Sequence, residues 1–117
     1  MAKVLKDILQ GFGNTPIVRL NKVARGVKPR IFAKLEMMNP GGSVKDRIAP
    51  YVVKNAEKRG LLRKGGTIIE PTSGNTGVGL AQLAAVKGYK VVFTMPDKVS
   101  QEKRALLRAY GAKLVLA

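Results

Sequence analysis

The second half of the chain alternates short apolar runs with longer segments in which apolar positions recur at helical spacing. Short runs rich in β-branched residues are typical of strands, and periodic segments closed by a glycine are typical of helices. The expected strands cover 67–70, 90–95 and 113–116, and the expected helices cover 77–87 and 101–110, the second capped by Ser100. This order predicts parallel strands joined by right-handed helical crossovers.

The predicted fold class is therefore α/β, a parallel-sheet three-layer unit with helical crossovers. Parallel strands are usually covered by helices on both faces of their sheet. Two helices between three strands leave one face short of cover. Because the sequence stops at Ala117, in or just after the last expected strand, we expect an incomplete α/β domain.

The first half of the chain is less regular. Short strands are expected at 17–20 and 30–36, followed by a turn at the "NPGG" of Asn39–Gly42. Ser43 is placed to N-cap a helix, with Asp46 three residues later as in a capping box, and Gly60 to end it. Pro50 disturbs that helix, so either the helix kinks there or a short first turn precedes a helix that restarts at Pro50.

Composition removes several classes of chemistry. The 117 residues include no cysteine and no histidine, which excludes disulfides, thiolate nucleophiles, Ser-His-Asp catalysis and His/Cys metal sites. We accordingly expect no metal. No apolar run approaches the roughly 20 residues of a membrane span. The first residues also lack the long apolar core of a signal peptide, so the cytoplasm is the expected location and no membrane contact is expected.

Charge is the unusual property of the sequence. Lys and Arg number 22 against 7 Asp and Glu, which gives a formal net charge of +15. Such an excess can indicate nucleic acid or an acidic partner. The basic residues are, however, spread over the expected solvent faces of helices, and only 5% of residues are aromatic. We therefore favour a solvated basic surface and do not expect nucleic-acid binding.

A polar loop, "EPTSGNTG" at Glu70–Gly77, follows the expected strand 67–70. Ligands of open parallel sheets bind at the carboxyl ends of strands, and the amino end of the next helix favours an anion. The hydroxyl and amide side chains of the loop suit a carboxylate or a phosphate; they are Thr72, Ser73, Asn75 and Thr76. Simple capping and turn formation is the alternative, but a cap needs only one such residue.

A second loop, "NPGGSVKDR" at Asn39–Arg47, contains Lys45 at the second position of the helix expected after Ser43. The amino end of a helix disfavours a cation, which suits a lysine that reacts as a free amine. Asp46 and Arg47 are expected to pair with neighbours and orient the turn. The alternative is a solvated lysine in a first helical turn.

Taken together, the two loops resemble the cysteine synthase / cystathionine β-synthase family, pyridoxal 5'-phosphate (PLP) enzymes of the tryptophan-synthase-β fold type (PLP fold type II). The resemblance covers nearly the whole chain in order. It is carried by "GNTPIVRLN" at Gly13–Asn21, "AKLEMMNPGGSVKDR" at Ala33–Arg47, "GGTIIEPTSGNTGVGLA" at Gly65–Ala81 and "MPDKVSQEKRALLRAYGAKLVL" at Met95–Leu116.

The resemblance implies a role for each loop. Lys45 would bind PLP covalently and later shuttle the Cα proton of the substrate, and Asn75 would bind the ring hydroxyl oxygen of the cofactor. Thr72, Ser73 and Thr76 would bind the α-carboxylate of an amino-acid substrate. The implied reaction is β-replacement in cysteine biosynthesis, in which O-acetylserine reacts with sulfide. The alternative is the cystathionine β-synthase reaction of serine with homocysteine, toward which "PDKVS" at Pro96–Ser100 leans.

The resemblance also implies what surrounds this chain. Residues 1–40 would be lead-in strands that join a larger PLP domain, and 41–117 an incomplete small mobile α/β domain, with the remainder of the catalytic domain absent. No candidate for the glycine-rich phosphate loop or the ligand of the pyridine nitrogen occurs here. We expect an amino-terminal fragment that is inactive alone and a homodimer at full length. A non-catalytic fragment or α/β interaction module is the remaining alternative.

Overall fold

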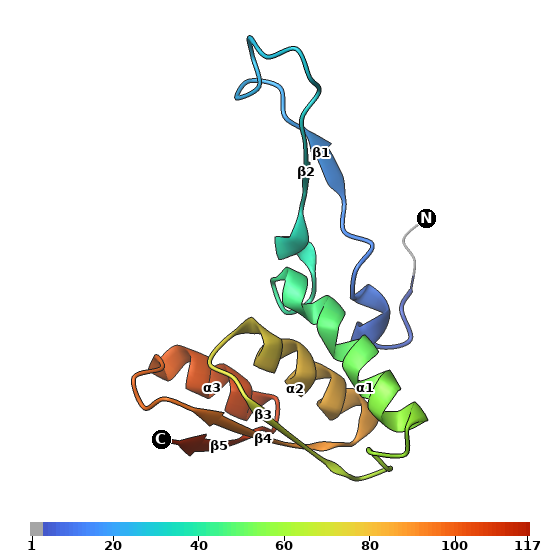
Figure 1. The fold of residues 1–117 in the computed structure, drawn as a ribbon, viewed down its shortest axis with the longest axis vertical. Coiled ribbons are helices and arrows are strands. Elements are labelled where there is room, and N and C mark those ends of the chain that lie inside the picture. Colours follow the sequence, from blue (N-terminus) through green and yellow to red (C-terminus); the bar gives the residue numbers. More distant parts are fainter. Residues whose placement is uncertain (1–3) are drawn as a thin grey trace.

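The computed structural model describes residues 4–117 and contains a parallel sheet of three strands. The strands are β3 (Thr67–Pro71), β4 (Lys90–Met95) and β5 (Lys113–Leu116), in the order β3-β4-β5 (Figure 1). In the register of the sheet, Ile69 lies beside Val92 and Phe93 beside Leu114. The α/β class and the parallel sheet expected from the sequence are confirmed.

Helix α2 (Asn75–Lys87) joins β3 to β4, and helix α3 (Gln101–Ala109) joins β4 to β5. Every residue from Gly77 to Ala84 is buried, as expected for a helix that is apolar on all sides. Gly88 ends α2 in the left-handed conformation, with φ of 76°. Ser100 caps α3 by accepting a hydrogen bond from the backbone N–H of Lys103. Helix α2 begins two residues before the expected start.

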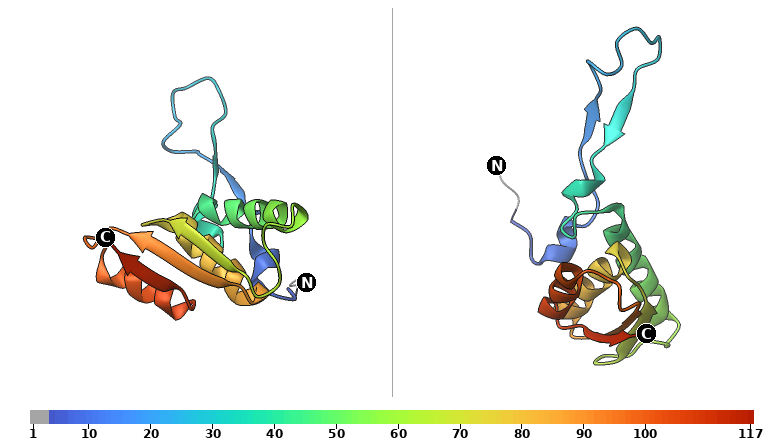
Figure 2. Two further views of the ribbon diagram at one scale, coloured as in Figure 1. Left: turned by 60° about the horizontal axis from the view of Figure 1, so that its bottom comes forward. Right: turned by 90° about the vertical axis from the view of Figure 1, so that its left-hand side faces the viewer.

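The hydrophobic core lies between these helices and one face of the sheet. Its largest fully buried apolar side chains belong to strand β4 and the helices around it: Phe93, Leu83, Leu107 and Val53. The opposite face of the sheet is open, as the views in Figure 2 show. Ile69 on that face is 68% exposed and Val115 is 40% exposed. The expected shortage of cover on one face is confirmed for the described residues.

The segment before the sheet forms a four-residue 3-10 helix, η3 (Val44–Arg47), and then α1 (Ile48–Lys58), which packs on α2. Pro50 is therefore the third residue of α1, in the first turn, where its missing N–H has no intrahelical partner to lose. Of the two alternatives for Pro50, the short first turn followed by a new helix is close to what is found. The new helix begins at Ile48, two residues before Pro50. Only Ala49 and Val53 of α1 are fully buried.

Two short antiparallel strands, β1 (Ile17–Arg19) and β2 (Phe32–Lys34), form a hairpin that projects from the α/β body (Figure 1). β2 is shorter than expected because Leu35, with φ −85° and ψ 69°, leaves the extended conformation ahead of a 3-10 turn, η2 (Glu36–Met38). A further 3-10 turn, η1 (Ile8–Gly11), packs against α2 and was not expected from the sequence.

The helices within residues 4–117 are too short or too polar to cross a membrane.

Candidate functional site

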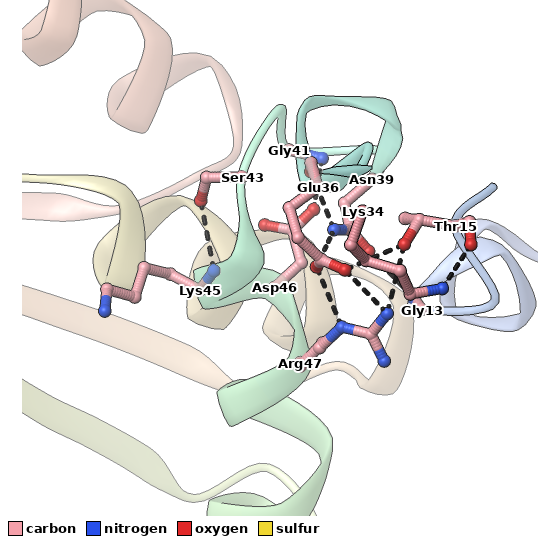
Figure 3. A network of polar contacts seen from close by, with 10 residues as sticks. All are labelled: Gly13, Thr15, Lys34, Glu36, Asn39, Gly41, Ser43, Lys45, Asp46 and Arg47. Atoms are coloured by element: carbon pink, nitrogen blue, oxygen red, sulfur yellow. Dashed lines mark hydrogen bonds and ion pairs between the residues drawn. The ribbon is translucent and has the colours of Figure 1, made fainter. Parts of the chain in front are cut away.

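Lys45 is the second residue of η3, two residues after the cap residue Ser43. The hydroxyl oxygen of Ser43 accepts a hydrogen bond of 3.2 Å from the backbone N–H of Lys45. The side chain of Lys45 is exposed and points away from the polar network on the other side of its turn (Figure 3). The backbone of this lysine is thus tied locally while its amine is accessible.

Asp46 is completely buried, with 0% of its surface exposed. Its Oδ2 accepts a hydrogen bond from the backbone N–H of Gly41. The capping box expected from Ser43 and Asp46 is therefore wrong in its second half, because the carboxylate turns toward the "NPGG" turn instead of toward the N–H of Ser43. Burial raises the pKa of the Asp46 carboxyl group, and the bond from Gly41 opposes that change.

Helix α2 packs against this turn at Gly79. A Cβ atom added at Gly79 would lie 3.1 Å from the Cα of Asp46 and 3.4 Å from the carbonyl oxygen of Lys45. Only glycine allows so close an approach of the two backbones without displacement. Because Gly79 lies near the start of α2, this contact sets the turn of Lys45 beside the amino-terminal half of α2.

The loop that leads into α2 is organised around Thr72. Its hydroxyl oxygen accepts hydrogen bonds from the backbone N–H groups of Gly77, at 3.2 Å, and Gly74, at 3.4 Å. Gly77 is the third residue of α2, and its N–H also donates to the carbonyl oxygen of Gly74 at 3.1 Å, so Thr72 supplies a second acceptor in the first turn of the helix. Thr72 is thus half-buried and caps the helix, while Ser73 and Asn75 are exposed and Thr76 is half-buried.

Replacing Thr72 by valine is expected to destabilise the fold by about 1 kcal/mol, because valine keeps the shape and removes the acceptor for Gly74 and Gly77. Urea denaturation measures the change. Ser73→Ala is the matched control: it removes an exposed hydroxyl that makes no hydrogen bond within the described residues, and its effect is expected within about 0.5 kcal/mol. Equal losses in the two variants would contradict the capping role of Thr72.

The two predicted loops line one small cleft. The cleft has a volume of about 120 Å³, and its lining includes Gly41 from the "NPGG" turn and Ser73, Gly74 and Asn75 from the polar loop. Lys103, from the first turn of α3, lines it too. Lys103 was not singled out from the sequence, since a lysine in a first helical turn is usually solvated. Lys45 itself is not among the lining residues.

A network of polar side chains lies on the other side of the Lys45 turn (Figure 3). Nε and Nη2 of Arg47 donate to the two carboxylate oxygens of Glu36 at 2.8 and 2.9 Å. The hydroxyl group of Thr15 donates to Glu36 at 2.8 Å, and Nδ2 of Asn39 donates to it at 2.9 Å. Pairing of Asp46 and Arg47 with neighbours was expected from the sequence, although their partners Gly41 and Glu36 were not identified.

The surroundings of Glu36 predict a pH-dependent stability. Hydrogen bonds from Arg47, and then from Thr15, lower the pKa of the Glu36 carboxyl group from 4.5 to about 2. Because the ionised Glu36 carboxylate is favoured in the folded state, its contribution to the free energy of unfolding is fully present above pH 4.5. That contribution is lost as the pH falls toward 2 and the carboxylate is protonated. Denaturation between pH 2 and 6 is expected to show a shallower acid loss in Glu36→Gln than in the wild type.

The raised pKa of Asp46 has the opposite effect on the pH dependence of stability. The folded state binds a proton at Asp46 more readily than the unfolded chain does, so this group favours the fold as the pH falls. Asp46 is present in both proteins, so the difference between the two curves reports Glu36. Parallel acid curves would contradict a carboxylate held ionised by Arg47.

The family described as pyridoxal-phosphate dependent enzyme matches residues 8–117. The chain belongs to this pyridoxal-phosphate dependent family. Over 114 residues this chain is 55% identical to cysteine synthase from Staphylococcus aureus. The match covers 97% of this chain and 37% of the relative. It is also 55% identical over 115 residues to cystathionine β-synthase from Apis mellifera, covering 97% of this chain and 23% of the relative.

A solved structure of O-ureido-L-serine synthase superposes on this PLP-family chain with a TM-score of 0.87 at 50% identity, covering 98% of this chain and 36% of that one. The resemblance to the cysteine synthase / cystathionine β-synthase family is confirmed, and so is the fold. The chain spans between 23% and 37% of the length of the two curated relatives.

Proposed function

We propose that this chain carries the cofactor lysine and the carboxylate-binding loop of a PLP-dependent enzyme that replaces the β-substituent of a serine derivative with a thiol. The observation that carries the proposal is the packing of the Lys45 turn on α2 at Gly79. It brings the two loops that the sequence marks for chemistry to one place in the fold, where Gly41 and Asn75 line the same cleft.

The residues present suit the cofactor. Lys45 offers an exposed amine that makes no hydrogen bond within residues 4–117, so it is available for covalent attachment. Asn75 is exposed at the first position of α2 and can donate to the ring oxygen of the cofactor. When bound, PLP supplies the electron sink that stabilises negative charge at the substrate Cα.

The protein side of the reaction then divides between the two loops. Lys45 would hold the cofactor through Nζ, and its amine is the group that would move the Cα proton of the substrate. The amino end of α2 presents N–H groups and a favourable dipole to the α-carboxylate, with the hydroxyl groups of Ser73 and Thr76 beside them. Thr72 contributes by holding the loop in shape, as its bonds to Gly74 and Gly77 support.

The substrate pair that we propose is O-acetylserine and sulfide, which give cysteine and acetate. The second candidate is serine and homocysteine, which give cystathionine and water. It is favoured by "PDKVS" at Pro96–Ser100, ahead of α3, whereas the identities to cystathionine β-synthase and to cysteine synthase are equal and do not separate the two. Product analysis of a longer chain that contains this segment, with each thiol in turn, separates the two.

We further propose that residues 1–40 join a larger domain of the whole protein, which would be a homodimer; the first three of these residues lie outside the described structure. The projecting hairpin supports the first part of this proposal. Its apolar side chains Ile17, Val18 and Phe32 are 63%, 43% and 50% exposed. A two-stranded hairpin with apolar side chains exposed to water is only marginally stable alone, so a partner surface that covers them would stabilise it.

The proposal predicts selective attachment of PLP. The purified chain is incubated with PLP and reduced with borohydride, and the modified peptides are mapped by mass spectrometry. A single dominant adduct at Lys45 is expected, and it should disappear in Lys45→Ala. Lys98→Ala removes another lysine of the chain and should leave the adduct in place. Labelling scattered over many lysines, unchanged in Lys45→Ala, would contradict the proposal.

A further inference from the structure

The polar network beside Lys45 joins three segments that are distant in sequence. They are the Gly13–Thr15 loop, the turn around Glu36 and Asn39, and η3 (Figure 3). Oδ1 of Asn39 accepts a hydrogen bond of 2.8 Å from the backbone N–H of Gly13, and Nζ of Lys34 donates to the carbonyl oxygen of Thr15. The base of the hairpin is thereby fastened to the turn that carries the proposed cofactor lysine.

At the centre of the network, the ion pair of Arg47 and Glu36 is bidentate. Two guanidinium nitrogens contact two carboxylate oxygens, and Nη2 of Arg47 also lies 3.2 Å from the hydroxyl oxygen of Thr15. A planar two-point contact fixes orientation as well as distance. Thr15 is buried, whereas the side chains of Glu36 and Arg47 are 23% and 37% exposed, so the contact is partly open to solvent and its geometry matters more than its charge.

Arg47 lies two residues after Lys45, and the residue between them is the completely buried Asp46. Asp46 holds Gly41 on one side and contacts Gly79 of α2 on the other. The turn is therefore held by Ser43 before Lys45 and by Asp46 and Arg47 after it, while the Lys45 side chain stays outside the network. Rotation of the turn would have to break the Arg47–Glu36 contact.

We propose that Glu36 and Arg47 are positioning residues for Lys45: their bidentate pair fixes the rotation of η3 and with it the direction in which the lysine side chain leaves the turn. This inference rests on the proposed function, and it goes beyond it by assigning a role to a residue, Glu36, from the segment ahead of the α/β unit. A displacement of about 1 Å is enough to slow a positioned reaction by a large factor.

The test measures how selectively PLP labels Lys45. Wild type, Glu36→Gln and Arg47→Lys are treated with PLP and borohydride, and the share of the total adduct found at Lys45 is determined over a range of PLP concentrations. Arg47→Lys keeps the charge and loses the planar fork, and Glu36→Gln keeps the shape and loses the charge. In both variants the Lys45 share is expected to fall by about tenfold, with half-maximal labelling at a higher PLP concentration.

Two controls separate positioning from general stability. Glu57→Gln breaks the other ion pair of the described residues, in which Nζ of Lys87 lies 2.6 Å from Oε1 of Glu57. Glu57 lies near the carboxyl end of α1, whereas Lys45 precedes the amino end of that helix. Val53→Ala weakens the core without touching the network. Both are expected to keep the wild-type share of adduct at Lys45 in the folded protein.

If Glu36→Gln and Arg47→Lys fail to fold, Thr15→Val replaces them in the test, because it removes only the hydroxyl group that contacts both residues. It is expected to lower the fraction of the adduct found at Lys45 about threefold. If Lys45 is labelled selectively in the wild type and equally selectively in every folded network variant, the positioning role is overturned. The proposed function is unaffected by that result. Scattered labelling in the wild type overturns the proposed function itself.

Discussion

Gly41→Ala is expected to destabilise the fold by about 3 kcal/mol. A Cβ at this position would overlap Oδ1 of Asp46 and lie 2.8 Å from its Oδ2. The carboxylate has no room to move, because Asp46 is completely buried. The turn must therefore open, which removes the hydrogen bond from the N–H of Gly41 and leaves a buried carboxylate without a partner.

Urea denaturation measures this loss, and Gly74→Ala is the matched control. Gly74 has an extended backbone, with φ −147°, and open space where the Cβ would be placed. Its replacement is expected to change the stability by no more than about 1 kcal/mol, because alanine restricts the unfolded chain but is a poorer N-cap than glycine. A Gly41→Ala protein as stable as Gly74→Ala would show that Asp46 does not fill the "NPGG" turn.

Phe93→Ala is expected to cost about 3–5 kcal/mol, a large part of the total stability of a domain of this size. Phe93 lies in the central strand β4 and is 0% exposed, in the core cluster formed with α2 and α3. Truncation leaves a cavity that the packed helices cannot fill. Chemical denaturation of the purified variant checks the value.

Ile69→Ala is the comparison for the sheet, because Ile69 lies on the neighbouring strand and on the opposite face. It is 68% exposed, so its truncation is expected to cost about 0.5 kcal/mol. A loss as large as that of Phe93→Ala would mean that the open face of the sheet is buried in solution, against the arrangement described for this chain.

The sequence predicted the elements best where the hydrophobic pattern and its punctuation agree. β4 and β5 have the expected bounds, because each apolar run follows a glycine that ends a helix, Gly88 or Gly111. Helix α2 starts two residues earlier than expected, at Asn75, and the hydroxyl oxygen of Thr72 accepts from the N–H of Gly77 in its first turn. The apolar pattern that predicts a helix does not show at which residue such a cap contact begins it.

The first forty residues were the hardest to predict. The alternation of 30–36 continues through Leu35 and Glu36, yet the strand ends at Lys34, because Leu35 leaves the extended conformation ahead of η2, the turn from which Glu36 accepts Arg47. Asp46 was expected to cap its own helix and is drawn instead to Gly41 by a buried contact. In both cases a specific contact outweighs a local motif: Arg47 is 11 residues from Glu36, and Gly41 is 5 residues from Asp46.

The sequence identified the candidate site by its residue types and not by its geometry. Lys45 and the loop 72–76 were singled out separately, and their neighbourhood depends on Gly79, whose lack of a side chain lets α2 approach Asp46. Lys103 could not be found, since it reaches the cleft only through the packing of α3. The roles of the site residues stay predictions, carried by the resemblance and supported by this packing.

The central claim is that Lys45 and the loop before α2 act as one site. The most direct measurement compares amide NMR spectra of the chain before and after a pyridoxyl group is fixed on Lys45 by borohydride reduction. The account predicts resonance shifts concentrated at Thr72–Thr76, including the side-chain amide of Asn75, and none of them in Lys45→Ala treated in the same way. A chain modified at Lys45 whose loop resonances do not move would contradict the claim.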